Sequence, residues 1–170
     1  MQNFTQISLK QSDSNNQMII EQYQQLLSAD KAQKTHFFEG RYENIYIDKV
    51  LLTSTQNLFS EITTIAQQVI GTKQKLRMGF WFNEMQPGFR TVAHTHDEND
   101  ELLSGVYYLN VPKRSGDLLL GKGDDQIKIA PKAGDCIFFT PDVIHEVLPN
   151  ESAEMRLSIG MNFGYAERME

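Results

Sequence analysis

The sequence predicts a mainly β fold, a sandwich or jelly roll, preceded by helices. All five prolines and most of the glycines lie in the second half of the chain, where they separate short apolar stretches. Glutamine is dense before residue 75, and there the apolar residues follow helical spacing instead. At 170 residues with 40% hydrophobic content, the chain suits one domain with a core of its own.

Two helices are expected in the first half of the chain. The weaker one spans 16–28, and the stronger one spans 53–70. Apolar residues recur at helical spacing in the second of these, at Leu58, Ile62, Ile65 and Val69. Thr53 and Gln56 have the spacing of a capping box, and Gly71 is a typical helix stop.

Strands dominate from residue 75 onward. Eight are expected, at 75–85, 91–96, 102–110, 117–120, 126–129, 135–139, 143–148 and 155–163. Their short connections favour a sandwich or jelly roll, and a further strand is expected over 41–50. The helices would pack on the outer face of one sheet. We therefore expect a single domain, 1–170, with a helical buttress at 1–74 and a β core at 75–165.

Composition excludes several classes of protein. The net charge of −6 disfavours a nucleic-acid binder, which needs a basic face. The single cysteine, Cys136, excludes an internal disulfide and a cysteine-cluster metal site, and its apolar surroundings predict a packing role. Apolar runs are too short to span a bilayer, and the first residues do not resemble a secretory signal. A cytoplasmic protein is the expectation.

Three of the four histidines form the strongest chemical signal. His94 and His96 are two apart in a predicted strand, so both imidazoles point to one face and can bind one metal. His145 lies in a later strand that a jelly roll can place beside them. Three such ligands with open positions are the pattern of non-haem iron sites. The acidic run that follows offers Glu98 or Glu101 as a carboxylate ligand, although a solvated loop is the simpler interpretation.

A second group of residues suits a carboxylate ligand. In the strand 155–163, Arg156, Ser158 and Gly160 share one face. An arginine fork and a hydroxyl side by side bind a carboxylate well if that face is interior. Tyr108 can point into the same interior, or it can simply pack.

These motifs, taken together, resemble a known family. The order runs His94-x-His96, Ser104-Gly-Val-Tyr-Tyr-Leu-Asn110, Ser115-Gly-Asp-Leu-Leu119, Pro131-x-x-Gly134-Asp, Pro141-x-x-x-His145-Glu-Val-x-Pro149 and Arg156-x-Ser158. It is similar to that of the iron(II)/2-oxoglutarate-dependent dioxygenases, in particular the prolyl-hydroxylase-like branch and a bacterial group with an H-x-H signature. The resemblance covers 81–163 and implies a double-stranded β-helix.

The resemblance also implies roles for individual residues. His94 and His145 match the first and the distal metal histidines. Arg156 matches the residue that binds the distal carboxylate of 2-oxoglutarate, and Ser158 and Tyr108 match its helpers. Leu119 matches an apolar wall of the cosubstrate pocket.

His96 departs from the family pattern, which has Asp or Glu at this position. Either His96 is a true ligand in a three-histidine site, or a nearby carboxylate substitutes for it; strand geometry favours His96. The spacing Gly88-x5-His94-x-His96-x4-Glu101 also resembles the first cupin motif, in which Glu101 would be a fourth ligand. The alternative prediction is thus a cupin-type metalloenzyme that does not use 2-oxoglutarate.

The resulting expectation is an Fe(II)- and 2-oxoglutarate-dependent oxygenase, a hydroxylase that converts 2-oxoglutarate to succinate. A small molecule and a protein side chain both remain open as substrates. Trp81, Asn83 and Arg90 are candidates for the substrate side, although packing and solvation explain them equally well. We expect no nucleic acid and no membrane partner, and the N-terminal helices are compatible with a homodimer without requiring one.

Overall fold

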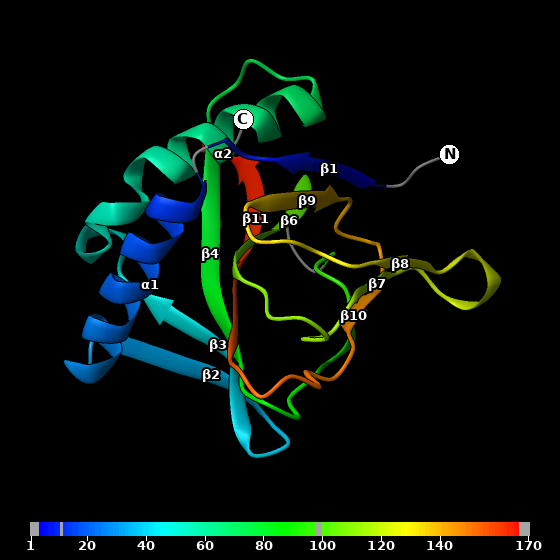
Figure 1. Ribbon diagram of the computed structural model, residues 1–170. Helices are drawn as coiled ribbons and strands as arrows, with labels where there is room; N and C mark the ends of the chain where they lie inside the picture. Colours follow the sequence, from blue (N-terminus) through cyan, green and yellow to red (C-terminus); the bar gives the residue numbers. More distant parts are fainter. Residues whose placement is uncertain (1–3, 11, 98–99, 167–170) are drawn as a thin grey trace.

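Two antiparallel sheets face each other, and two helices cover the outer face of the larger sheet (Figure 1). The computed structural model describes residues 4–10, 12–97 and 100–166. The strands are β1 Phe4–Ser8, β2 Ala32–Phe38, β3 Arg41–Ile47, β4 Leu76–Met85, β5 Thr91–His94, β6 Leu103–Asn110, β7 Leu118–Leu120, β8 Ile127–Ile129, β9 Asp135–Phe139, β10 His145–Val147 and β11 Arg156–Tyr165. The larger sheet has the order β1-β9-β6-β11-β4-β3-β2, and the smaller one has the order β5-β10-β7-β8.

All eight strands expected from residue 75 onward are present, with ends that differ by up to two residues. The strand expected over 41–50 is β3. Two strands were not predicted: β1 pairs with β9 along its whole length, and β2 pairs with β3 at the opposite edge. The segment 1–74 therefore adds three strands to the larger sheet besides its helices. The division into one domain remains a prediction.

The helices are α1, Ser12–Ser28, and α2, Gln56–Ile70. The predicted capping box is wrong, because Thr53 begins a short 3-10 turn and the residue before α2, Thr55, makes no side-chain capping bond. The predicted stop is confirmed. Gly71 has φ 76°, in the left-handed region that glycine tolerates, and its N–H donates to the Gln67 carbonyl at 2.9 Å.

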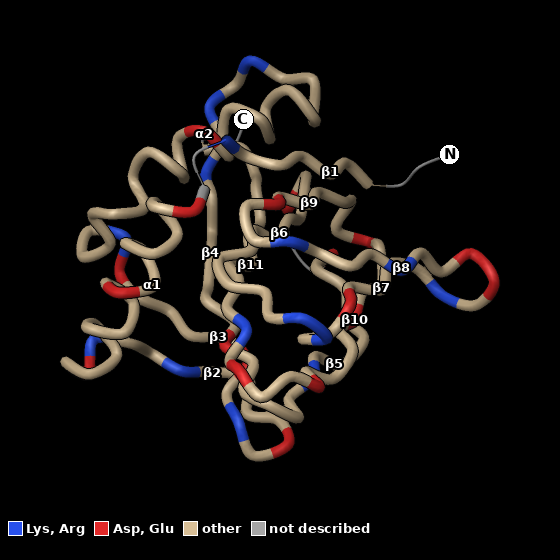
Figure 2. The backbone as a smooth tube through the Cα atoms, in the orientation of Figure 1, with Lys and Arg blue, Asp and Glu red and all other residues tan. Residues whose placement is uncertain are grey.

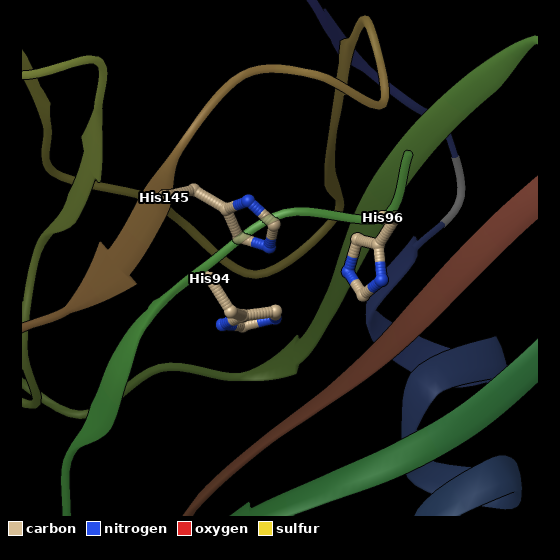
Figure 3. Close-up of side chains that lie close together, drawn as sticks. All are labelled: His94, His96 and His145. Carbon is tan, nitrogen blue, oxygen red and sulfur yellow. The ribbon is translucent and has the colours of Figure 1, made fainter. Parts of the chain in front are cut away.

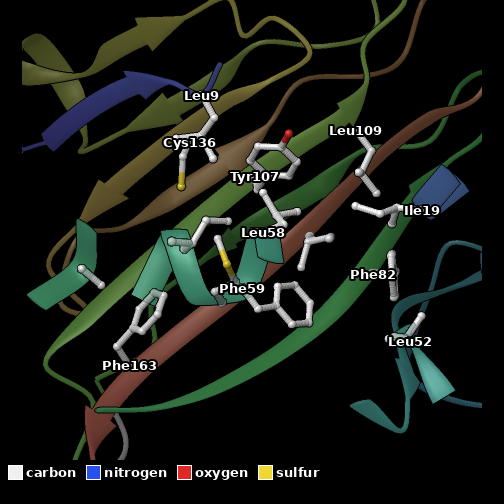
Figure 4. Packing of buried hydrophobic residues seen from close by; sticks show 14 of the residues in the cluster. Leu9, Ile19, Leu52, Leu58, Phe59, Phe82, Tyr107, Leu109, Cys136 and Phe163 are labelled. Atoms are coloured by element: carbon white, nitrogen blue, oxygen red, sulfur yellow. The ribbon is translucent and has the colours of Figure 1, made fainter. Parts of the chain in front are cut away.

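Alternation along β11 divides the interior into two layers. Leu157, Ile159 and Met161 pack with the helices in the outer layer, part of which is drawn in Figure 4. The opposite face of β11 looks toward the smaller sheet, as predicted. Between the two sheets lies a second cluster, formed by Tyr108, Leu118, Leu120, Ile129, Ile137 and Phe139. Cys136 is fully buried in the outer layer, and burial raises the pKa of its thiol, in keeping with a packing role.

One buried polar residue fixes α1 to the sheet. The side chain of Asn16 is 3% exposed, donates to the carbonyls of Tyr108 and Leu109, and accepts a 2.6 Å bond from the Tyr107 hydroxyl. The sheet partner is β6, the strand that also carries Tyr108 into the space between the sheets. The docking of the helix and the shape of the interior are therefore connected.

We expect Asn16→Ala to lower the free energy of unfolding by about 1–3 kcal/mol, because it leaves the buried Tyr107 hydroxyl and two carbonyls without their partner. For a chain of this size, that loss corresponds to a fall in melting temperature of roughly 2–12 °C. Thermal unfolding followed by circular dichroism measures it. Asn15→Ala is the matched control, since Asn15 is exposed; equal shifts for both variants would contradict the assignment.

None of the helices in the described residues is long and apolar enough to span a membrane. Figure 2 shows lysine and arginine scattered over several elements and interspersed with acidic residues.

Candidate metal and cosubstrate site

Three histidines come together where the smaller sheet meets the cavity between the sheets (Figure 3). His94 ends β5 and is paired in register with His145, the first residue of β10. His96 follows two residues after His94, and its backbone N–H donates to the Pro141 carbonyl at 2.9 Å. The ligand atoms of the three side chains all lie within 4.8 Å of one another. Sequence reasoning predicted this cluster by placing His94 and His96 in one strand, but β5 ends at His94 and His96 lies two residues beyond it.

Two of the three imidazoles are fixed by hydrogen bonds to the backbone. Nδ1 of His94 lies 2.8 Å from the Val92 carbonyl, and Nδ1 of His145 lies 3.0 Å from the Val143 carbonyl. A carbonyl only accepts, so these contacts assign the proton of each ring to Nδ1. Nε2 of both rings is then left with its lone pair available for a metal ion.

His96 is held differently. Among the described residues its ring has no hydrogen-bond partner, and its neighbour is the Trp81 indole, with ring centroids 5.4 Å apart. Trp81 faces Gly160 across the β4–β11 pair. A Cβ at residue 160 would lie 2.6 Å from Cζ2 of Trp81, so only glycine leaves room for the indole in this position.

Burial keeps His96 and His145 neutral. It lowers the pKa of His145 to about 3 and that of His96 to about 4, and the neighbouring His94 adds to both shifts. Metal binding requires neutral imidazole, so the environment favours the ligating form at neutral pH.

Arg156 lies on the inward face of β11, at another wall of the same cavity, and is 1% exposed. One terminal guanidinium nitrogen, Nη1, donates to the carbonyls of Ser115 and Gly116. No carboxylate of the described residues lies within ion-pair distance of this guanidinium. Burial lowers the pKa of Arg156, the sign of a cation taken out of water without full compensation.

Polar atoms without partners surround this arginine. Within the described part of the chain, Nε of Arg156, the hydroxyl of Tyr108 and Oγ of Ser115 are buried and make no hydrogen bond. The guanidinium carbon lies 5.0 Å from the centre of the Tyr108 ring. Burial raises the pKa of Tyr108 to about 12, so its hydroxyl is protonated and can donate. A carboxylate ligand could accept hydrogen bonds from these buried donors and pair with the cation. Without such a ligand, the unsatisfied donors lower the stability of the protein.

A cavity of about 440 Å³ joins the histidines to Arg156. Tyr108 and Ser158 also line it. Leu119 does not; Leu118, one residue earlier on β7, lines it instead. The difference is one of register: Leu118 and Leu120 point into the cluster between the sheets, so Leu119 points away from it.

The other candidates divide between the cavity and the surface. Trp81 and Asn83 line the cavity, whereas Arg90 is exposed and pairs with Glu39 at 2.9 Å. Glu101 also lines the cavity, but among the described residues the group able to hold a metal contains only the three histidines. The four-ligand cupin set with Glu101 is therefore not assembled. Glu98 lies outside the described residues.

Sequence reasoning missed two residues of the site: Ser115, which lies beside Arg156, and Glu43, which lines the cavity. Ser115 offers a partnerless hydroxyl near Arg156, but it lies in a turn whose sequence carries no strand alternation. Glu43, on β3, lines the cavity, although the segment that contains it was expected only to support the β core. The strand that contains Glu43 was predicted, but its pairing with β4 was not. Without that pairing, Glu43 could not be placed in the cavity.

Several known proteins are similar to this chain. The sequence profile of the 2OG-Fe(II) oxygenase superfamily matches residues 80–164, half of the chain. No curated protein matches it in a sequence comparison.

Solved structures match over almost the whole chain. A Pseudomonas putida prolyl-4-hydroxylase has 18% identity and a TM-score of 0.76, covering 95% of this chain and 92% of its own. A Trichoplax adhaerens prolyl hydroxylase, solved with a hypoxia inducible factor peptide fragment, has 17% identity, a TM-score of 0.75 and coverages of 96% and 84%. The nogalamycin epimerase SnoN, solved with Fe3+ and alpha ketoglutarate, has 16% identity, a TM-score of 0.74 and coverages of 96% and 79%. The predicted fold, a double-stranded β-helix with N-terminal helices, is confirmed.

Proposed function

The chain belongs to the 2OG-Fe(II) oxygenase superfamily, and on that premise we propose that it hydroxylates a C–H bond of its substrate in the cavity between the sheets. As a member of this family it is a 2-oxoglutarate-dependent oxygenase that uses Fe(II) and 2-oxoglutarate. In the proposed reaction, R–H, O2 and 2-oxoglutarate give R–OH, succinate and CO2. One oxygen atom enters the alcohol and the other enters succinate, so atoms and electrons balance.

The residues present fit the metal. His94, His96 and His145 would hold Fe(II) with three neutral nitrogen ligands. When bound, the iron supplies the O2 chemistry that no side chain of the protein can perform. The Val92 and Val143 carbonyls keep the protons of His94 and His145 on Nδ1, which orients both rings before the metal arrives.

The residues present also fit 2-oxoglutarate. The partnerless Nε of Arg156 and hydroxyl of Tyr108 are the observation that carries this assignment. A carboxylate placed between them would accept charge-assisted hydrogen bonds from both, and Ser158 would donate a further one. Leu118 and the cluster between the sheets would keep water from this end of the cavity.

Anaerobic titration of the Fe(II)-loaded protein with 2-oxoglutarate tests the proposal. We expect the weak visible charge-transfer absorption of an iron–keto-acid chelate to appear and saturate. The same titration of His145→Ala should give no band, because the variant lacks a metal ligand. Wild-type protein that binds Fe(II) and develops no band would overturn the proposal.

The remaining assignments are also proposals. The single cysteine, buried and unpaired, supports a reducing compartment, the cytoplasm, as the location. The acidic net charge supports a substrate other than nucleic acid. Either a small molecule or a peptide side chain suits a cavity of about 440 Å³. A homodimer through the helices stays a prediction.

A further inference from the structure

One end of the cavity is free once the metal and the cosubstrate have been placed. Its walls come from β3, β4 and the segment that leads into β6. They carry polar and aromatic side chains: Glu43, Asn44, Tyr46, Trp81, Asn83 and Glu101. The substrate must share the cavity with these groups, so their chemistry limits what it can be.

The charge at this end is negative. Arg156 is the only lysine or arginine among the described residues that line the cavity, and it belongs to the cosubstrate end. The negative charge of Glu43 is paired with Arg41, whose Nη2 lies 3.4 Å from Oε1 of Glu43. Glu101 has no such partner: its Oε2 is buried and makes no hydrogen bond within the described structure.

An unpaired buried carboxylate oxygen is unfavourable unless a donor completes it. Leaving a buried charged group without its hydrogen bond costs more than leaving a neutral one. Arg41 does not complete Glu101: its two terminal guanidinium nitrogens donate to Asn83, Glu84, Glu43, Arg90 and Thr91, and its Nε makes no hydrogen bond within the described structure. A donor that arrives with the substrate would satisfy Glu101.

The aromatic walls suit the same kind of donor. Trp81 and Tyr46 line this end of the cavity, and the faces of such rings attract cations, tryptophan most strongly. Trp81 also lies beside His96, with ring centroids 5.4 Å apart. A positive group on Trp81 would therefore sit close to the three histidines.

We infer that the substrate carries a positively charged nitrogen group, an ammonium or a guanidinium, which binds Glu101 and the face of Trp81. The inference rests on the proposed function, since it names the substrate class of the same site. The carbon to be hydroxylated then lies a few bonds from the charged nitrogen. A free amine and a basic side chain of a peptide present the same group.

Succinate formation from 2-oxoglutarate by the Fe(II)-loaded enzyme tests this, with and without added probes. Butylguanidinium is compared with butylurea, which has nearly the same shape and no charge, and pentylammonium is compared with 1-pentanol. Acetylated Gly-Arg-Gly and Gly-Lys-Gly amides form the peptide arm. We expect at least one charged probe to raise succinate formation about tenfold or more above its uncharged counterpart. A response confined to the amides would assign the substrate to peptides.

Variants at Glu101 sharpen the test. We expect Glu101→Gln to raise the concentration of charged probe needed for half-maximal stimulation by about 10- to 100-fold, the usual value of a hydrogen bond to a charged group. Glu61→Gln, on the exposed side of α2, is the control and should change nothing. Circular dichroism shows whether the variants fold, and the probe comparison in the wild type does not depend on them.

The outcomes separate the two proposals. No succinate under any condition, together with no charge-transfer band, would overturn the proposed function. A band with basal succinate that no charged probe raises, or that butylurea and pentanol raise equally, would overturn the substrate class alone. Unchanged stimulation of Glu101→Gln would also overturn it.

Discussion

Arg156→Met is expected to lose the rise in melting temperature that 2-oxoglutarate gives the metal-loaded wild type. Ligand at a hundred times its dissociation constant stabilises a protein by about 2.7 kcal/mol, which for this size corresponds to roughly 5–11 °C. Methionine fills much of the arginine's volume but offers no donor, so a carboxylate would be buried without its partner. Truncating one side of such a pair costs about 2–5 kcal/mol, and the stabilisation should fall almost to zero.

Differential scanning fluorimetry, performed anaerobically with and without 2-oxoglutarate, measures this effect. Arg77→Met is the matched control, because the Arg77 side chain is 41% exposed and its ion pair with Asp100 lies at the surface. Arg156→Lys should recover only part of the rise, since lysine keeps the charge and loses the planar fork. An undiminished rise in Arg156→Met would remove Arg156 from the cosubstrate site.

His145→Ala is expected to weaken metal binding by more than the ~10–100-fold that loss of an outer-shell partner typically costs. His145 is 7% exposed and meets both neighbouring imidazoles, at ring-centroid distances of 4.2 Å from His94 and 5.0 Å from His96. Titration with Co(II), followed by its visible absorption, gives the affinity without turnover. His36→Ala is the control, because His36 lines the cavity but lies outside the cluster. Similar losses in both variants would argue against the three-histidine site.

Gly160→Ala is expected to displace Trp81 and with it the support of His96. Overpacking of this kind costs about 1–3 kcal/mol. Trp81 is the only tryptophan, so its fluorescence maximum and its quenching by Co(II) report the change directly. Gly79→Ala is the matched control, since a Cβ there would meet nothing closer than the Asn162 carbonyl oxygen at 3.9 Å. Unaltered fluorescence in Gly160→Ala would show that the indole is not held by this glycine.

The histidine cluster was predictable because its signal is local. His94 and His96 are only two residues apart, although β5 ends at His94 and the strand expected over 91–96 is shorter than predicted. Arg156 and Ser158 depend on the period of a strand, β11. Long-range pairing carried no such signal. The pairing of β1 with β9 joins residues more than a hundred positions apart, and β2 has the polar composition typical of an edge strand. The position of Glu43 in the cavity depends on another long-range pairing, that of β3 with β4, so sequence reasoning did not find it.

Residue roles were harder to predict than positions. Leu118 and Leu119 are identical in type, and only the register of a three-residue strand decides which of them faces the cavity. The partnerless hydroxyl of Ser115 was invisible for another reason: a missing hydrogen bond is a property of the packed state and has no residue pattern.

The strand β1 has a consequence for solubility rather than for catalysis. It pairs with all five residues of β9, and each of those residues is buried. Without β1, the apolar run Cys136-Ile137-Phe138-Phe139 would form an open sheet edge able to pair with another chain. A chain shortened by residues 1–9 should therefore self-associate, as light scattering would show, while keeping its three histidines. The first strand therefore covers a sheet edge that would otherwise promote aggregation.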